Sequence, residues 1–297
     1  MWRPCGRSPE SACAWLPKQS GKFVVRDWID AALLAWLIAS ALALVIGISV
    51  QLAQQLEPPQ RRARRLIVKA AAGNWNNLQV SGTFLTRPPP EIGQSAALET
   101  LDLDENRLAE LPPEIGQLGN LKYLRLSVNE LAELPPEFGQ LSSLLSLKID
   151  RNRLVGLPPV ICRLTRLQSL DLSWNQLRSL PPEIGQLAGL EELDASWNPL
   201  ARLAPEIGEL KALRTLSLRH AQLTALPSEI GQMQGLQSLD LGYNQLSLLP
   251  RELGLINLSA LDLEGNPLIW PPREVISKGT GAILAALREA AGPPDLA

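Results

Sequence analysis

The sequence predicts an α/β fold: a right-handed solenoid with a parallel concave β-sheet and short helical or 3₁₀ convex segments, preceded by one N-terminal transmembrane helix. Three observations lead to this prediction. A 23-residue phrase recurs along most of the 297-residue chain. The chain has 25 Pro and 21 Gly but only 4% aromatic residues, so it needs many defined turns around an aliphatic core. Residues 31–50 form a long uncharged run.

The repeated phrase fills residues 98–270 in eight copies, of which the seventh is 22 residues long. The first two copies begin at Leu98 and Leu121 and read LETLDLDENRLAELPPEIGQLGN and LKYLRLSVNELAELPPEFGQLSS. Every copy except the sixth, where Ala221 stands instead, carries an asparagine at one fixed place: Asn106, Asn129, Asn152, Asn175, Asn198, Asn244 and Asn266. Units of this size cannot bury their apolar side alone, so the repetition predicts that they stack on one another.

Each copy supplies its own local signals. Alternation in xLxL predicts a short strand with Leu101 and Leu103 inward and Asp102 outward. The asparagine that follows can hydrogen-bond to backbone groups where the chain turns, so the seven asparagines predict a structural ladder along the stack. LPPEIG then predicts a helical or 3₁₀ segment, since proline fits the first turn and glutamate favours the positive end of a helix.

The phrase LxxLxLxxNxLxxLPxEIGxL resembles the leucine-rich repeat family in its 23-residue LPxxI form. The resemblance covers about residues 75–291 and implies a horseshoe of parallel strands. It extends to bacterial arrays, including those that precede the GTPase module in Roco proteins. No GxxxxGK[ST] phosphate loop occurs in the sequence, so that family's GTPase activity is not carried over.

Both ends of such an array need covers, because terminal repeats would otherwise expose apolar faces and strand edges. Residues 61–97 predict an N-terminal cap and a degenerate repeat, with a helix over Arg61–Ala72 and Thr83 in the place of the asparagine. Residues 271–297 predict a C-terminal cap and tail, with an apolar-faced helix near Ala282–Ala290.

The uncharged run Ala31–Val50 would form a helix roughly 30 Å long, the thickness of a hydrocarbon core. It predicts a single-pass anchor between an N-terminal tail, residues 1–30, and a linker, residues 51–60. A cleaved signal peptide and a buried soluble helix are the alternatives. Five cations follow the run within twenty residues and three precede it, which favours a cytoplasmic repeat body over a secreted or extracytoplasmic one.

Composition argues against several kinds of chemistry. His220 is the single histidine and three cysteines lie at no zinc-like spacing, so we expect no catalytic site, no cofactor and no metal. Cys162 is interpreted as a small buried apolar residue. Residues 98–270 carry 14 Lys and Arg against 22 Asp and Glu, which argues against nucleic acid as a partner.

The variable positions of the strands predict where a protein or peptide partner binds. The position before each ladder asparagine holds four neighbouring side chains of binding type, Trp174, Trp197, His220 and Tyr243, and these are expected to form the hot spot. The rest of the predicted concave binding set is Arg151, Asp171, Asp194, Asp240, Arg219 and Tyr123. The alternative is that the tryptophans only cover the strand edge. The predicted function is a membrane-anchored, non-enzymatic binding scaffold with a use in signalling, and the alternative is a secreted or envelope-exposed adhesion protein.

Overall fold

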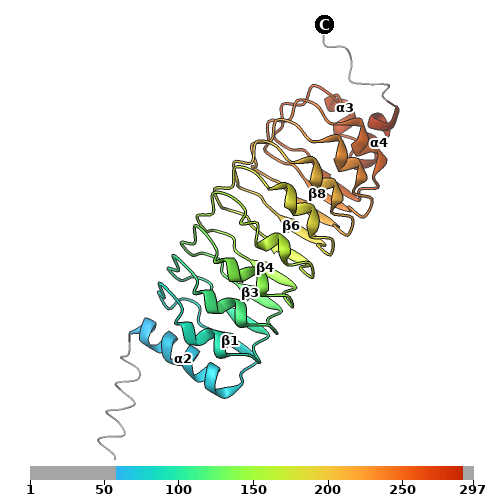
Figure 1. Cartoon of the computed structure of the whole chain (residues 1–297). Helices are drawn as coiled ribbons and strands as arrows, with labels where there is room; N and C mark the ends of the chain where they lie inside the picture. Colours follow the sequence, from blue (N-terminus) through green and yellow to red (C-terminus); the bar gives the residue numbers. More distant parts are fainter. Residues whose placement is uncertain (1–57, 290–297) are drawn as a thin grey trace, which may run out of the picture. The chain divides into compact units, whose positions relative to one another are not determined.

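Residues 58–289 are described by the computed structural model, and they form one solenoid (Figure 1). Nine strands form a single sheet in which each strand pairs in parallel with the next along the chain. The register sets identical positions of successive repeats side by side, as in Leu101 opposite Leu124. The strands are β1 Asn77–Gln79, β2 Thr100–Asp102, β3 Tyr123–Arg125, β4 Ser146–Lys148, β5 Ser169–Asp171, β6 Glu192–Asp194, β7 Thr215–Ser217, β8 Ser238–Asp240 and β9 Ala260–Asp262.

The side opposite the sheet carries one 3₁₀ helix per repeat. Five of the eight have proline at the first position and seven have a glutamate in the first turn, as the sequence predicts. The 3₁₀ helices are η1 Pro90–Gln94, η2 Pro113–Gln117, η3 Pro136–Gln140, η4 Ile161–Arg163, η5 Pro182–Gln186, η6 Pro205–Glu209, η7 Ser228–Gln232 and η8 Arg251–Leu255.

The core is a continuous column of leucines between these two sides. Leu101 and Leu103 are fully buried while Asp102 is only partly covered, which confirms the predicted alternation. The packing of the repeats explains why a glycine, Gly116, stands in η2. A Cβ at this position would overlap the backbone carbonyl oxygen of Glu137 in the next repeat. The stacked 3₁₀ turns therefore approach so closely that only glycine fits at this point.

Helices cover both ends of the array. α2 (Pro59–Gly73) packs on η1 and begins two residues before the predicted start at Arg61, inside the segment predicted as a linker, because proline fits the first helical turn. α3 (Arg273–Ile276) and α4 (Thr280–Glu289) form the other cover, with Ile283, Leu284 and Leu287 buried. The predicted transmembrane helix over Ala31–Val50 lies outside the described residues. Among the helices of residues 58–289, none has the length and hydropathy that crossing a bilayer requires.

Candidate functional site

The four predicted hot-spot side chains form one continuous stack of rings. The ring centres of Trp174 and Trp197 are 4.2 Å apart with an interplanar angle of 12°. Those of Trp197 and His220 are 3.8 Å apart at 25°, and those of His220 and Tyr243 are 4.7 Å apart at 16°. The structure thus brings together residues that are 23 positions apart in sequence.

The backbone conformation at this column explains why the rings line up. Trp174, Trp197, His220 and Tyr243 all lie in the left-handed region, with φ between 54° and 56°. Equivalent residues of other repeats, such as Arg151, adopt the same conformation. The N–H of Trp197 donates to the carbonyl of Arg219 at 2.8 Å, which ties the turn to the next repeat. Each side chain therefore leaves the turn in the same direction, one repeat apart.

The stack is solvent-accessible along its edge. Trp174 is 47% exposed, Trp197 39% and Tyr243 40%, although neighbours cover the ring faces of Trp197 and His220. Arg151 extends the column beyond Trp174, with its Cζ 6.0 Å from the ring centre. A partner would meet a row of ring edges, with Arg151 beside the outer face of Trp174.

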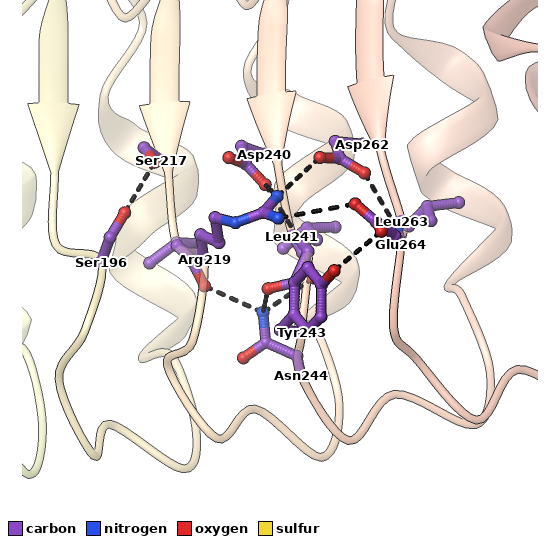
Figure 2. Close-up of polar contacts among 12 residues, drawn as sticks. Ser196, Ser217, Arg219, Asp240, Leu241, Tyr243, Asn244, Asp262, Leu263 and Glu264 are labelled. Atoms are coloured by element: carbon purple, nitrogen blue, oxygen red, sulfur yellow. Dashed lines mark hydrogen bonds and ion pairs between the residues drawn. The ribbon is translucent and has the colours of Figure 1, made fainter.

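At the other end of the stack, the guanidinium of Arg219 lies over the ring of Tyr243. The Arg219 side chain reaches across two repeats (Figure 2). Its guanidinium lies 2.8 Å from Asp262, 3.7 Å from Asp240 and 3.5 Å from Glu264. Burial by itself would lower the pKa of Arg219, but the three carboxylates together raise it. Arg219 thus balances one of the three negative charges at this end and engages Asp240, which the sequence predicts as part of the binding surface.

Gly242 makes this reach possible. A Cβ at Gly242 would lie 2.5 Å from Nη1 of Arg219, so a larger residue would make the end of this side chain shift. Cζ of Arg219 also lies 4.4 Å from the ring centre of Tyr243, whose hydroxyl donates to Glu264 at 2.7 Å. This hydrogen bond raises the pKa of Tyr243. The group fixes the position of the last aromatic ring.

The predicted acidic residues at the ends of their strands also have a structural use. Asp171, Asp194 and Asp240 each accept the backbone N–H two residues further on, at 2.9–3.0 Å. Such side-chain turns cap the strand ends. Burial raises the pKa of Asp194. Asp171 and Asp194 form no ion pair among residues 58–289, so no cation of the described residues balances their charge.

Tyr123 lies outside the aromatic stack, on β3. It is 47% exposed, and the position it occupies is the first of its strand. Nearby, Arg125 donates to Asp104 at 2.7 Å, a pair that the sequence analysis missed. The hydrogen bond to Asp104 raises the pKa of Arg125, and the pair is part of the concave surface.

The asparagine ladder is present in all seven predicted positions. Nδ2 of Asn152 donates to the carbonyls of Leu126, Ile149 and Asp150, and its Oδ1 accepts the N–H of Leu131 at 3.0 Å. The same pattern occurs at Asn106, Asn129, Asn175, Asn198, Asn244 and Asn266. Thr83 extends it into the degenerate repeat by donating to Oδ1 of Asn106 at 2.8 Å.

At the gap left by Ala221 the backbone takes over. The N–H of Leu200, which a ladder asparagine would accept, donates instead to the carbonyls of Asn198 and Ala221 at 2.9 and 3.0 Å. This arrangement places Ala201 and Gln222 in the left-handed region, with φ 59° and 57°. Among their equivalents in the other described repeats, Phe84 alone has a positive φ, 55°, and it follows Thr83, where the ladder asparagine is also missing.

The fold and the site define a solenoid with a preformed concave surface, and comparison with known proteins agrees. A model described as leucine-rich repeat region matches residues 114–217, and two leucine rich repeat models match residues 211–268 and 97–118. The chain belongs to the leucine-rich repeat family, whose members are typically protein-interaction scaffolds. None of the curated proteins compared with it gives a match. The 23-residue LPxxI class stays a prediction.

Many solved structures are similar to this chain, among them the following three. The leucine-rich repeat domain of the type III effector XopL is 29% identical, with a TM-score of 0.65 over 74% of this chain and 78% of that one. A plant peptide hormone receptor, RGFR1 in complex with RGF2, is 34% identical with a TM-score of 0.56. That match covers 65% of this chain and 36% of the receptor, so this chain spans about a third of its length. An internalin of Listeria monocytogenes, 21% identical with a TM-score of 0.57 over 68% and 58% of the two chains, shares the fold.

Proposed function

We propose that this protein is a membrane-anchored, non-enzymatic scaffold that recognises a protein or peptide through the edge of its stacked rings. The observation that carries the proposal is the exposed stack from Trp174 to Tyr243. Tryptophan and tyrosine bury much area for little loss of rotamer freedom, which is why they dominate binding hot spots. Rings held by neighbours and by a fixed backbone lose still less on binding.

Charge around the stack favours a partner with a basic segment. Asp171 and Asp194 lie on the strands that precede Trp174 and Trp197 and form no ion pair among the described residues. Asp240, in contrast, is engaged by Arg219. A lysine or arginine of the partner would therefore meet the carboxylates of Asp171 and Asp194 while its apolar side chains contact the rings.

An anchor over Ala31–Val50 would raise the concentration of the scaffold near membrane-associated partners. We propose a cytoplasmic body, supported by the excess of cations after the apolar run, and a use in signalling. The plant receptor that this chain resembles was solved with a peptide hormone, which supports a peptide as one form of partner. Protease accessibility of the body in intact cells separates this proposal from a secreted or envelope-exposed adhesion protein.

Selection of displayed random peptides on the full-length chain, followed by affinity measurements, tests the binding site. Trp174→Ala and Trp197→Ala should each weaken the selected peptides by about 2 kcal/mol, or roughly 30-fold. Leu255→Ala is the matched control, because Leu255 is 64% exposed on η8, away from the sheet. Peptides that bind both tryptophan variants as well as the parent chain would show that the stack is structural.

The same peptides test the charge preference. Asp171→Asn removes the charge and keeps the Oδ1 that accepts the Ser173 N–H. It should weaken peptides rich in lysine and leave uncharged peptides unchanged. Equal loss for both kinds would mean that Asp171 acts only through the strand end.

A further inference from the structure

Helix α2 carries an unusual distribution of charge. Its buried side consists of Ala63, Ile67 and Ala70, which pack toward the first repeat. The exposed side carries four cations and no carboxylate: Arg61, Arg62, Arg64 and Lys69. The cap is therefore strongly basic, while the array behind it is acidic.

The four exposed cations of α2 lie together on one helix that has no carboxylate of its own. In the array, several exposed cations pair with a glutamate one repeat away, as Arg87 does with Glu110 at 2.8 Å and Arg153 does with Glu130 at 3.0 Å. Others, such as Arg166, Arg178 and Arg202, form no ion pair among the described residues but lie in separate repeats. Within residues 58–289, Arg61, Arg62, Arg64 and Lys69 form no such pair.

Their position along the helix is also unfavourable for the isolated domain. Arg61 and Arg62 lie in the first turn, where the helix dipole is positive, and the last turn carries no basic residue. The 3₁₀ helices of the array show the opposite choice, with glutamate in the first turn. Cations at a helix N-terminus are repelled by the dipole, so this arrangement does not serve the stability of α2. An anionic surface would remove the repulsion.

Two apolar side chains complete the patch. Val68 is 46% exposed on the same outer side of α2, and Trp75, 39% exposed, lies against Gly73 at the end of the helix. Cations interleaved with exposed apolar and indole side chains are typical of helices that lie on a membrane surface. The apolar run ends at Val50, only nine residues before Pro59.

We infer that the outer side of α2, with Arg61, Arg62, Arg64, Lys69, Val68 and Trp75, docks on an anionic bilayer surface. The cations contact lipid phosphates and carboxylates, and Val68 and Trp75 enter the headgroup region. The inference extends the proposed anchoring by adding a lipid-selective contact on the repeat body, and it does not depend on the aromatic stack. A nucleic acid is the other polyanion that could meet this charge, but it leaves Val68 unexplained.

The test uses the full-length chain in nanodiscs of phosphatidylcholine alone or with about 30% phosphatidylserine. Hydrogen exchange of the α2 amides and quenching of Trp75 by brominated lipid, taken as the difference from Trp75→Phe, report docking. Both should appear only with phosphatidylserine and weaken with salt. The triple variant Arg61→Gln, Arg62→Gln, Arg64→Gln should lower the docking equilibrium constant about 100-fold, since each cation near such a surface contributes roughly 1 kcal/mol.

Two controls separate charge from fold and position. Lysine at the same three positions should keep docking, because the charge is kept. Arg166→Gln, Arg178→Gln, Arg202→Gln removes three exposed cations from the array and should leave docking unchanged. Equal protection of α2 in both lipids, equal loss in the array variant, or tighter binding to duplex DNA than to phosphatidylserine vesicles would overturn the inference. If the chain does not stay bound to phosphatidylcholine nanodiscs, the proposed membrane anchor over Ala31–Val50 is refuted. The docking of α2 can then still be tested by co-flotation of the chain with phosphatidylserine vesicles.

Discussion

Substituting Ala221 by asparagine would restore the missing member of the ladder, and we expect it to stabilise the array. In the other repeats, Oδ1 of a ladder asparagine accepts a backbone N–H from the repeat before it, two residues after that repeat's own asparagine. Oδ1 of Asn198, for example, accepts the N–H of Leu177 at 3.0 Å. At the gap, Leu200 is paired with backbone carbonyls instead, and Ala201 and Gln222 are held in the left-handed region.

The magnitude follows from these contacts. Release of the two left-handed residues contributes about 2 kcal/mol. The new side-chain hydrogen bonds of the asparagine add only about 1 kcal/mol, because the backbone carbonyls to which it would donate already have donors. Ordering the asparagine side chain costs about 1 kcal/mol of conformational entropy, which offsets this gain. A net gain of about 2 kcal/mol corresponds to a rise in Tm of roughly 4 to 8 °C for an array of this size. Pro199 does not cause the distortion, since Pro267 follows Asn266 with no left-handed residue two positions on.

Thermal unfolding of the full-length chain measures this effect, and slower hydrogen exchange at Leu200 locates it. Asn152→Ala is the reverse experiment at an intact rung. It leaves the buried Leu131 N–H without its acceptor and should cost about 3 kcal/mol. If Ala221→Asn lowers the Tm while Asn152→Ala behaves as expected, the ladder reasoning is wrong for the sixth repeat.

Two further substitution pairs test the packing and the strand caps. Gly116→Ala places a Cβ against a backbone carbonyl and should destabilise by about 1–3 kcal/mol, whereas Gly119→Ala meets nothing within 4 Å and should stay within about 0.5 kcal/mol; equal melts would refute the close packing of the 3₁₀ turns. Burial raises the pKa of Asp194, so the native state keeps the proton of this carboxyl to a higher pH than the unfolded chain does. The free energy of unfolding therefore falls as the pH rises from the unfolded pKa of about 3.9 through the higher pKa of the native state. Asp194→Asn keeps the acceptor and should flatten this pH dependence without loss at pH 7, while Asp194→Ala should lose about 1 kcal/mol; an unchanged slope in urea titrations of Asp194→Asn would contradict the assignment.

The fold could be predicted because every repeat carries several independent sequence signals for the same local structure. Leucine alternation fixes which side of a strand is buried, and Leu101 and Leu103 are fully buried as expected. The asparagine marks the turn, and its hydrogen bonds confirm the ladder. Helix ends were less well predicted, since α2 begins at Pro59 and α4 at Thr280, where packing on a neighbouring repeat extends what local sequence signals suggest.

The site could be predicted only as a set of columns. Counting positions places Trp174 beside Trp197, but it does not reveal the sign of φ or the direction in which a side chain leaves the turn. The reach of Arg219 to Asp262 spans 43 residues and depends on the space above Gly242. Arg219 and Gly242 occupy neighbouring places in a column that holds only aspartates and serines in the five preceding repeats, and this departure is the signal in the sequence from which the contact could have been inferred.

Stability alone does not account for the aromatic column. Parallel strands lie about 4.8 Å apart, so rings that leave successive turns in the same direction must stack whatever their purpose. The three ring contacts from Trp174 to Tyr243 contribute roughly 0.5–1.5 kcal/mol each. Holding four residues with a Cβ in the left-handed region costs on the order of 1 kcal/mol each, which largely offsets this gain. Glycine or asparagine at these positions would avoid most of the strain, so the exposed ring edges, rather than the melting temperature, are what the aromatic residues provide.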